Sequence, residues 1–159
     1  MKGRDYLYHK ELGYLIILEE SDGISSIILS DEIPKFKIIK SDEVEKCKEQ
    51  LKEYLEGKRK IFDLKLDIKG SEFRKKAWNE LRKIPYGEKI TYQEQATRIG
   101  KPEAARAVGQ ANGDNPILIV IPCHRVIGKS GKLTGYSSCG GIKTKEFLLK
   151  LEEENYETN

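Results

Sequence analysis

Residues Asn115 to Arg125 read N-P-I-L-I-V-I-P-C-H-R and place a cysteine, a histidine and an arginine directly after an apolar run. Ile117 to Ile121 are consecutive aliphatic residues between two prolines, which predicts a short strand buried on both sides. Pro122 fixes φ just before Cys123, so the thiol leaves the strand end on a backbone with little freedom. The stretch therefore predicts a rigidly held nucleophile.

The chemistry expected of Cys123 depends on its neighbours. The thiolate is the reactive form of cysteine, and a base such as His124 favours it. The alternative is a cysteine that only packs, although a core does not accept His124 and Arg125 unless they are paired. Zinc is a third possibility. The spacing disfavours it, because there is no C-x-x-C and the only other histidine is His9.

The 159 residues fit one ordinary domain or two small ones. No apolar run is long enough to span a bilayer, and the N-terminus lacks the apolar core of a signal peptide. Three cysteines at unhelpful spacings predict reduced thiols instead of a disulfide framework. We therefore expect a soluble, cytoplasmic protein with no membrane partner.

The net charge of +3 hides an asymmetry along the chain. Residues 1–69 hold 14 basic and 15 acidic residues, whereas residues 70–151 hold 15 basic and 7 acidic residues, a net charge of +8. Such a basic region indicates a polyanionic partner, and a merely solvated surface is the alternative.

The first half predicts a small α/β domain over residues 1–69. Apolar runs at Tyr14–Leu18 and Ile24–Leu29, separated by an Asp-Gly pair, predict an antiparallel hairpin. A helix is expected from its N-cap Ser41 to Gly57, with Cys47 on its buried stripe. The alternating segment Ile61–Ile68 is either a last strand or a tether to the second half.

The second half begins with a helix capped by Ser71. Thr91-Tyr-Gln-Glu94 is a capping box that opens a short helix reaching about Arg98. Gly100 is expected to end it and Pro102 to open the next helix. Two short helices joined by a glycine turn predict a helix-turn-helix.

The outer side of the second of these helices is small and polar, with Ala105, Arg106, Gly109 and Gln110 on it. A glycine inside a helix costs about 1 kcal/mol relative to alanine, and close approach of another molecule explains it. Arg106 then points toward a nucleic-acid groove, and an ordinary solvated arginine is the alternative.

The last predicted helix runs from Ile142 to about Glu153, with Phe147, Leu148 and Leu151 facing inward. Glu152 then lies beside the inward face, where it is able to meet His124. The alternative is that Glu152 is only the first residue of a solvated acidic run.

From about Phe73 to Glu152 the chain resembles the O6-alkylguanine-DNA alkyltransferase family. The matching pieces are Ile84-Pro85-x-Gly87, Thr91-Tyr92, Ala105-Arg106-Ala107-Val108-Gly109, Asn115-Pro116, Pro122-Cys123-His124-Arg125-Val126, Gly135-Tyr136, and Lys145 with Leu148-Leu149. The resemblance implies an α/β (α+β) fold, with a small N-terminal α/β domain of antiparallel strands over 1–69. It also implies a helix-turn-helix, winged-helix-like DNA-binding domain over 70–159.

The resemblance also implies roles in the reaction. Cys123 is similar to the family's alkyl acceptor, His124 to its base, and Glu152 to the group that orients the histidine. Asn115 is similar to the hinge that shapes the site, and Tyr92 to the group that assists departure of the guanine.

The DNA-contacting positions follow from the same resemblance. Arg106 is similar to the finger that enters the duplex where the damaged nucleotide has rotated out, and Tyr136 and Ser137 to the pocket wall. The other implied DNA contacts are Phe73, Gln93, Lys101, Ala104, Ala105, Gly109 and Lys129. Ser138-Cys139 departs from the family as an apparent insertion between Gly-Tyr and Gly-Gly, and it bears on which alkyl groups the pocket accepts.

The implied activity is a single, irreversible transfer of the alkyl group from O6-alkylguanine in double-stranded DNA to Cys123, with O4-alkylthymine as a second candidate substrate. The protein is expected to be a monomer that needs no cofactor and no metal. Two alternatives remain: a DNA-binding sensor of alkylated bases, whose known examples lack the cysteine, and a thiol hydrolase built on Cys123, His124 and Glu152.

Overall fold

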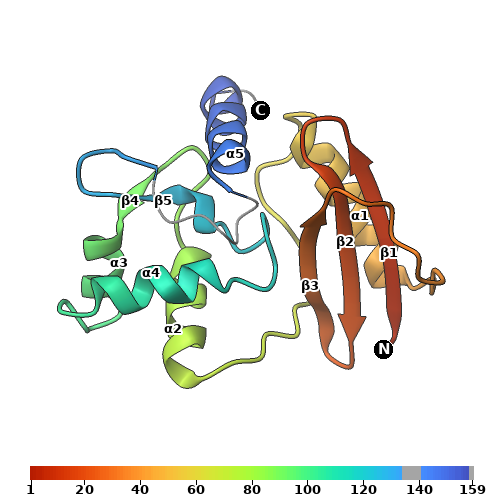
Figure 1. Cartoon of the computed structure of the whole chain (residues 1–159), viewed down its shortest axis with the longest axis horizontal. Helices are drawn as coiled ribbons and strands as arrows, with labels where there is room; N and C mark the ends of the chain where they lie inside the picture. The colour runs from red at the N-terminus through yellow and green to blue at the C-terminus, as the bar shows by residue number, and fades with distance from the viewer. Residues whose placement is uncertain (134–140, 158–159) are drawn as a thin grey trace. The chain divides into compact units, whose positions relative to one another are not determined.

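The computed structural model describes residues 1–133 and 141–157. The chain forms two compact units, Met1–Lys69 and a second that begins at Gly70 (Figure 1). Across the described residues, every helix is too short or too polar to cross a membrane.

The first unit is built on a three-stranded antiparallel sheet in the order β1 (Gly3–His9), β2 (Gly13–Glu20), β3 (Gly23–Ser30). The β2–β3 hairpin confirms the prediction made from the Asp-Gly pair, because Glu20 pairs with Gly23 across the turn. Strand β1 lies outside both predicted apolar runs, and it was missed because its alternation is carried by polar and tyrosine side chains.

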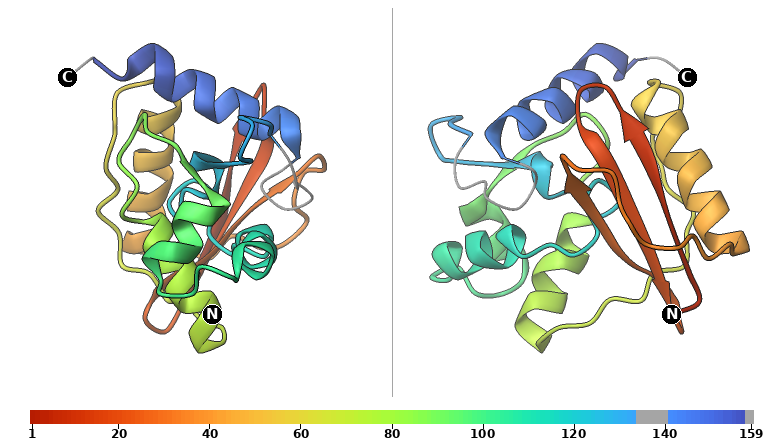
Figure 2. Two further views of the ribbon diagram at one scale, coloured as in Figure 1. Left: turned by 90° about the vertical axis from the view of Figure 1, so that its left-hand side faces the viewer. Right: turned by 45° about the vertical axis from the view of Figure 1, so that its right-hand side comes forward.

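Helix α1 (Asp42–Leu55) covers one face of this sheet (Figure 2). The Ser41 side chain accepts a hydrogen bond from the Val44 amide, which confirms the predicted N-cap. Alternate strand residues such as Leu15 and Ile17 are fully buried, as is Cys47 on the helix. Cys47 is therefore a core residue, as its place on the apolar stripe predicts.

The segment Ile61–Ile68 docks on the sheet without becoming a regular strand. Ile24 makes a single bridge to Leu66, with its amide donating to the Lys65 carbonyl at 2.8 Å. One bridge fixes the position of the segment, so it is an extended connection that lies along β3.

The second unit contains most of the helices and a two-stranded parallel ladder. Its elements are α2 (Glu72–Leu81), β4 (Ile90–Thr91), α3 (Tyr92–Arg98), α4 (Ala105–Gly113), the 3-10 turn η1 (Cys123–Arg125), β5 (Val126–Ile127) and α5 (Ile142–Asn155). Strand β4 pairs with β5 (Figure 1). Ser71 caps α2, and Thr91 with Glu94 forms the predicted capping box at the start of α3.

Helix α4 begins later than its sequence predicts. Gly100, at φ +80°, ends α3 as expected, but Pro102 lies in a turn and the first helical residue is Ala105. The Ala104 amide closes that turn on the Lys101 carbonyl at 2.9 Å. Proline suits the first position of a helix and a turn equally well, so it could not decide between them.

The predicted strand over Ile117–Ile121 is wrong. The run folds into a compact turn in which the Ile121 amide donates to the Ile117 carbonyl at 3.0 Å. Ile119 adopts a left-handed φ of +72°, which is a strained backbone for a β-branched residue. Burial requires these side chains to be apolar, but it does not require the backbone to be extended.

A buried amide pair joins α3 to α4. Gln95 and Asn112 exchange two hydrogen bonds of 2.9 and 2.7 Å, and Gln95 also donates to the Ala77 carbonyl in α2. The Trp78 indole donates to the Ala111 carbonyl at 2.7 Å. The orientation of α4 is therefore set by hydrogen bonds as well as by apolar packing.

Asn112→Ala is expected to reduce the free energy of unfolding by about 1–3 kcal/mol, because it removes the donor to the buried side-chain oxygen of Gln95. Urea unfolding followed by circular dichroism measures this. Gln110→Ala, on the exposed side of the same helix, serves as the control and should change stability by less than about 0.5 kcal/mol. Equal losses in the two variants would contradict a role for the pair.

Candidate active site around Cys123

Cys123 is the first residue of η1, and only 1% of its surface is exposed. The Asn115 side-chain amide lies 3.1 Å from its Sγ atom and donates to the Ile121 carbonyl at 2.7 Å. The Asn115 side-chain oxygen accepts from the Ile117 amide at 2.9 Å. One side chain therefore closes the strained turn and also contacts the sulfur that the turn presents.

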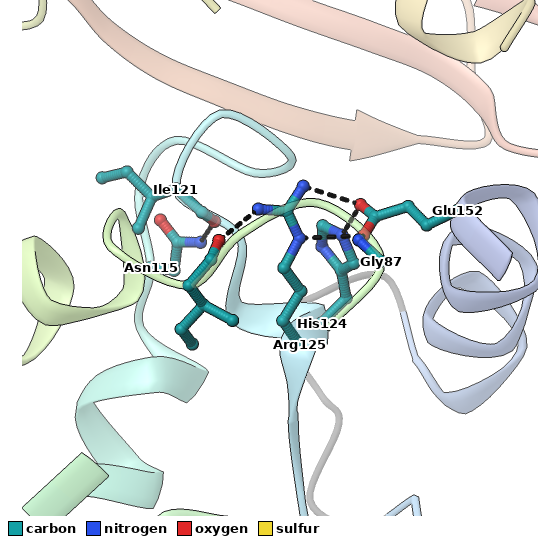
Figure 3. A network of polar contacts seen from close by, with 7 residues as sticks. Gly87, Asn115, Ile121, His124, Arg125 and Glu152 are labelled. Atoms are coloured by element: carbon teal, nitrogen blue, oxygen red, sulfur yellow. Dashed lines mark hydrogen bonds and ion pairs between the residues drawn. The ribbon is translucent and has the colours of Figure 1, made fainter. Parts of the chain in front are cut away.

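His124 meets Glu152 inside the unit, as the sequence predicts. The distance between His124 Nε2 and Glu152 Oε2 is 2.7 Å, and both side chains are about 99% buried (Figure 3). Helix α5 delivers the carboxylate and η1 delivers the imidazole, so residues far apart in sequence form one contact.

The protonation of this pair follows from its surroundings. Burial would raise the pKa of Glu152, but hydrogen bonds and charges from His124 and Arg125 outweigh burial and lower it. Glu152 is then a carboxylate and can only accept. His124 must donate from Nε2, so Nδ1 is the ring nitrogen with a lone pair for a proton. The pKa of His124 is lowered, chiefly by burial; Glu152 opposes this shift, and Arg125 and Lys145 add to it.

Arg125 holds the same carboxylate by both oxygens. Its Nε and Nη2 atoms each lie 2.9 Å from a Glu152 oxygen, and its Nη1 donates to the Ile84 carbonyl at 2.7 Å (Figure 3). The Gly87 amide also donates to Glu152, at 2.9 Å. The carboxylate thus joins α5, η1 and the segment between α2 and β4.

Lys145 is a second buried cation on α5. Its side chain is fully buried, donates to the Val126 carbonyl, and places Nζ 5.8 Å from the centroid of the Tyr92 ring. Burial lowers the pKa of Lys145 to about 7. The inward stripe of α5 therefore consists of Lys145, Leu148 and Glu152, whereas Phe147 and Leu151, predicted to face inward, are only half-buried.

The predicted DNA-contacting residues lie mainly on α3, on α4 and on the connection between them. Arg106 is exposed on α4, and Gly109 lies on the same helix beside Tyr92 of α3. The remaining positions are exposed or half-buried: Gln93, Lys101, Ala104, Ala105, Lys129 and, on α2, Phe73. Ala107, on the same helix, is also exposed. Tyr136, Ser137 and the Ser138-Cys139 insertion lie outside the described residues.

No set of three or more His, Cys, Asp and Glu side chains within residues 1–133 and 141–157 is arranged to hold a metal ion.

Arg125 and Lys145 lie in the motifs that carry the family resemblance, but the sequence predicted no role for either residue. A signal existed for both, because a charged residue within an otherwise apolar pattern must find a partner. The partner could not be named from the sequence: Glu152 is 27 residues from Arg125, and Val126 is 19 residues from Lys145.

The fold and the site define a mixed α/β protein in which a buried cysteine directly precedes a histidine that contacts a buried carboxylate, in a unit with two short adjacent helices. Two family models match nearly the whole chain. The 6-O-methylguanine DNA methyltransferase ribonuclease-like domain matches residues 4–68, and the DNA-binding domain of the same name matches residues 72–154. The chain belongs to the 6-O-methylguanine DNA methyltransferase family.

Individual relatives agree with this assignment. The chain is 44% identical over 151 residues to a methylated-DNA--protein-cysteine methyltransferase of Methanosarcina acetivorans, covering 92% of this chain and 96% of the relative. It is 44% identical to the constitutive enzyme of that name from Bacillus subtilis, covering 91% and 92%. A crystal structure of Mycobacterium tuberculosis OGT in complex with DNA superposes with a TM-score of 0.84 at 40% identity, covering 94% and 92%.

The lowered pKa of Lys145 predicts a dependence of stability on pH. Between pH 7 and the ordinary 10.5, the unfolded chain keeps a proton that the folded chain has released, so stability rises with pH by at most about 1.4 kcal/mol per pH unit. Lys145→Met lacks this proton. Its stability relative to the unsubstituted protein should therefore be greatest near pH 7 and fall toward pH 10.5.

Urea unfolding at several pH values measures this difference. Lys150→Met, at an exposed position of the same helix, is the matched control and should show no such trend. A difference for Lys145→Met that stays constant across the window would mean that Lys145 titrates at its ordinary pKa.

Proposed function

We propose that this protein repairs alkylated DNA by transferring an alkyl group from O6 of guanine to Sγ of Cys123, once per molecule. The observation that carries the proposal is the environment of the Cys123 side chain. Its sulfur contacts the Asn115 amide, and the next residue, His124, is hydrogen-bonded to a buried carboxylate. Family membership and the printed names of the relatives support the same reaction.

The reaction proposed is a displacement at carbon. The Cys123 thiol gives its proton to His124, and the sulfur forms a bond to the alkyl carbon while that carbon's bond to O6 breaks. The electron pair of the broken bond stays with the guanine, which takes up one proton in place of the alkyl group. The balance needs no oxidant, reductant or cofactor, and the thioether product ends the reactivity of that molecule.

The described surface of α4 suits close contact with DNA. A side chain placed at Gly109 would meet only Tyr92, at an ordinary 3.7 Å, so folding does not require glycine there. A glycine that the fold does not need is explained by the approach of a second molecule. Arg106 extends from this helix, and the net charge of +8 over residues 70–151 favours a polyanion.

We further propose that the substrate is double-stranded DNA carrying O6-alkylguanine and that the protein acts as a monomer in the cytoplasm. Contacts should go mainly to phosphates and sugars, because damage occurs at any sequence and small side chains read few base edges. A target base must be turned out of the stack to reach a buried thiol, at a cost of a few kcal/mol.

Incubation with DNA containing O6-methylguanine should add one methyl group to the protein, located on Cys123 by peptide mass spectrometry. Cys123→Ala should abolish the gain yet retain DNA binding, because the thiol does the chemistry and the helix surface supplies affinity. Cys47→Ala should still be methylated, because Cys47 is buried in the core of the first unit.

The alternatives give different outcomes in this experiment. A sensor would bind the DNA without gaining mass, and a thiol hydrolase would turn over a small ester repeatedly. Loss of DNA binding by a folded Cys123→Ala protein would contradict the proposed division between chemistry and affinity.

Arg106→Ala should slow methyl transfer from duplex DNA by at least about tenfold more than transfer from the free base O6-methylguanine, because only the duplex needs the vacated space filled. Single-turnover rates on the two substrates measure this. Lys58→Ala, an exposed position of the first unit with the same change in charge, is the control. Equal slowing on both substrates would assign Arg106 to the pocket or the fold.

A further inference from the structure

His124 and Arg125 both contact the Glu152 carboxylate. His124 Nε2 lies 2.7 Å from Oε2, and Arg125 Nη2 lies 2.9 Å from the same oxygen, while Arg125 Nε lies 2.9 Å from Oε1. Bidentate contacts between a guanidinium and a carboxylate are among the strongest hydrogen-bonded pairs in proteins. The negative charge that would stabilise a protonated His124 is therefore already paired with Arg125.

Arg125 is fixed in this position from several sides. Its Nη1 donates to the Ile84 carbonyl at 2.7 Å, its guanidinium carbon lies 5.7 Å from the centroid of the Tyr86 ring, and its side chain is only 8% exposed. A guanidinium stays charged in a protein, so its charge does not depend on pH.

We propose that Arg125 is a positioning residue that occupies both oxygens of Glu152 and so keeps His124 a neutral imidazole, ready to take the proton of Cys123. Glu152 orients the His124 ring by accepting a hydrogen bond from Nε2. Because Arg125 neutralises the Glu152 charge, that charge does not stabilise a second proton on Nδ1 of His124. The predicted effect on alkyl transfer rests on the proposed function, whereas the predicted effect on the titration of His124 does not.

The charged groups around His124 act on its pKa in both directions. Glu152, from α5, favours the imidazolium, whereas Lys145, also from α5, and Arg125, in the same turn, oppose it. Cys123 is the adjoining titratable residue, and the Tyr86 hydroxyl lies in the field of both Glu152 and Arg125. Burial is the largest cause of the lowered pKa of His124, since it disfavours the charged form, and the two cations act in the same direction as burial.

The decisive experiment is an NMR titration of the whole protein with isotope-labelled histidine. The chain has 2 histidines, so His9 in the first unit is an internal reference. In the unsubstituted protein His124 should titrate below 6.5. In Arg125→Met it should titrate above 6.5, because the buried carboxylate then acts on His124 alone.

This result separates the proposal from a purely structural role. Loosening of the site would expose His124 and move its midpoint only up to the ordinary 6.5. A midpoint at or below 6.5 in folded Arg125→Met would therefore overturn the proposal. Arg125→Lys, which keeps the charge, should restore a midpoint below 6.5.

Glu152→Gln supplies a test of opposite sign that does not require Arg125→Met to fold. Removing the carboxylate leaves Arg125 and Lys145 to act on His124, so its midpoint should fall further than in the unsubstituted protein. A rise above 6.5 would contradict the proposal, because loosening of the site moves the midpoint only up to 6.5. In the Glu152→Gln background, Arg125→Met should no longer raise the midpoint above 6.5, because the proposed effect passes through Glu152.

The same variants connect the titration to the chemistry. The alkylation rate should fall at low pH, where His124 is protonated. In Arg125→Met this fall should occur at higher pH, because the titration midpoint of His124 is higher. If the unsubstituted protein took up no methyl group, the proposed function would fail while the titration still tested Arg125. If methyl transfer were intact but the pH at which its rate falls did not shift with the titration midpoint of His124, the link between Arg125 and proton transfer would be wrong.

Discussion

The buried carboxylate of Glu152 is the group on which the second unit depends. An ionised carboxylate is costly inside a protein unless it is paired and hydrogen-bonded. Glu152 meets this requirement through His124, Arg125 and the Gly87 amide, which come from three separate segments. The same contacts that keep the charge in the core hold the last helix, the cysteine turn and the α2–β4 connection at fixed positions.

Asn115 applies a comparable constraint on the other side of Cys123. Its amide group holds both ends of the Ile117–Ile121 turn, where Ile119 is strained at a φ of +72°. Such strain persists only where surrounding contacts fix the backbone. Cys123 is therefore held between two polar anchors, one that sets the turn before it and one that sets the residues after it.

The sequence predicted the elements whose ends carry local signals. Ser41, Ser71 and Thr91 accept the capping hydrogen bonds expected of them, because a cap is decided within a few residues. The Ile117–Ile121 run was wrongly assigned, because its conformation is set by the Asn115 side chain and not by its own apolar pattern.

The site was predictable only in part for the same reason. Cys123, His124 and Glu152 could be nominated by residue type, and the His124–Glu152 contact followed from the helical spacing of α5. The competition between Arg125 and His124 depends on distances of 2.7 and 2.9 Å to a residue far along the chain. No sequence pattern reports that geometry.

The sequence separation between Cys123 and Glu152 has a consequence for biosynthesis. The ribosome releases the thiol before the residues of α5, so a nascent chain exposes Cys123 while His124 and Arg125 still lack their carboxylate. Until α5 docks, Glu152 cannot orient the imidazole. His124 and Arg125, which follow Cys123 directly, therefore gain their carboxylate only when α5 docks.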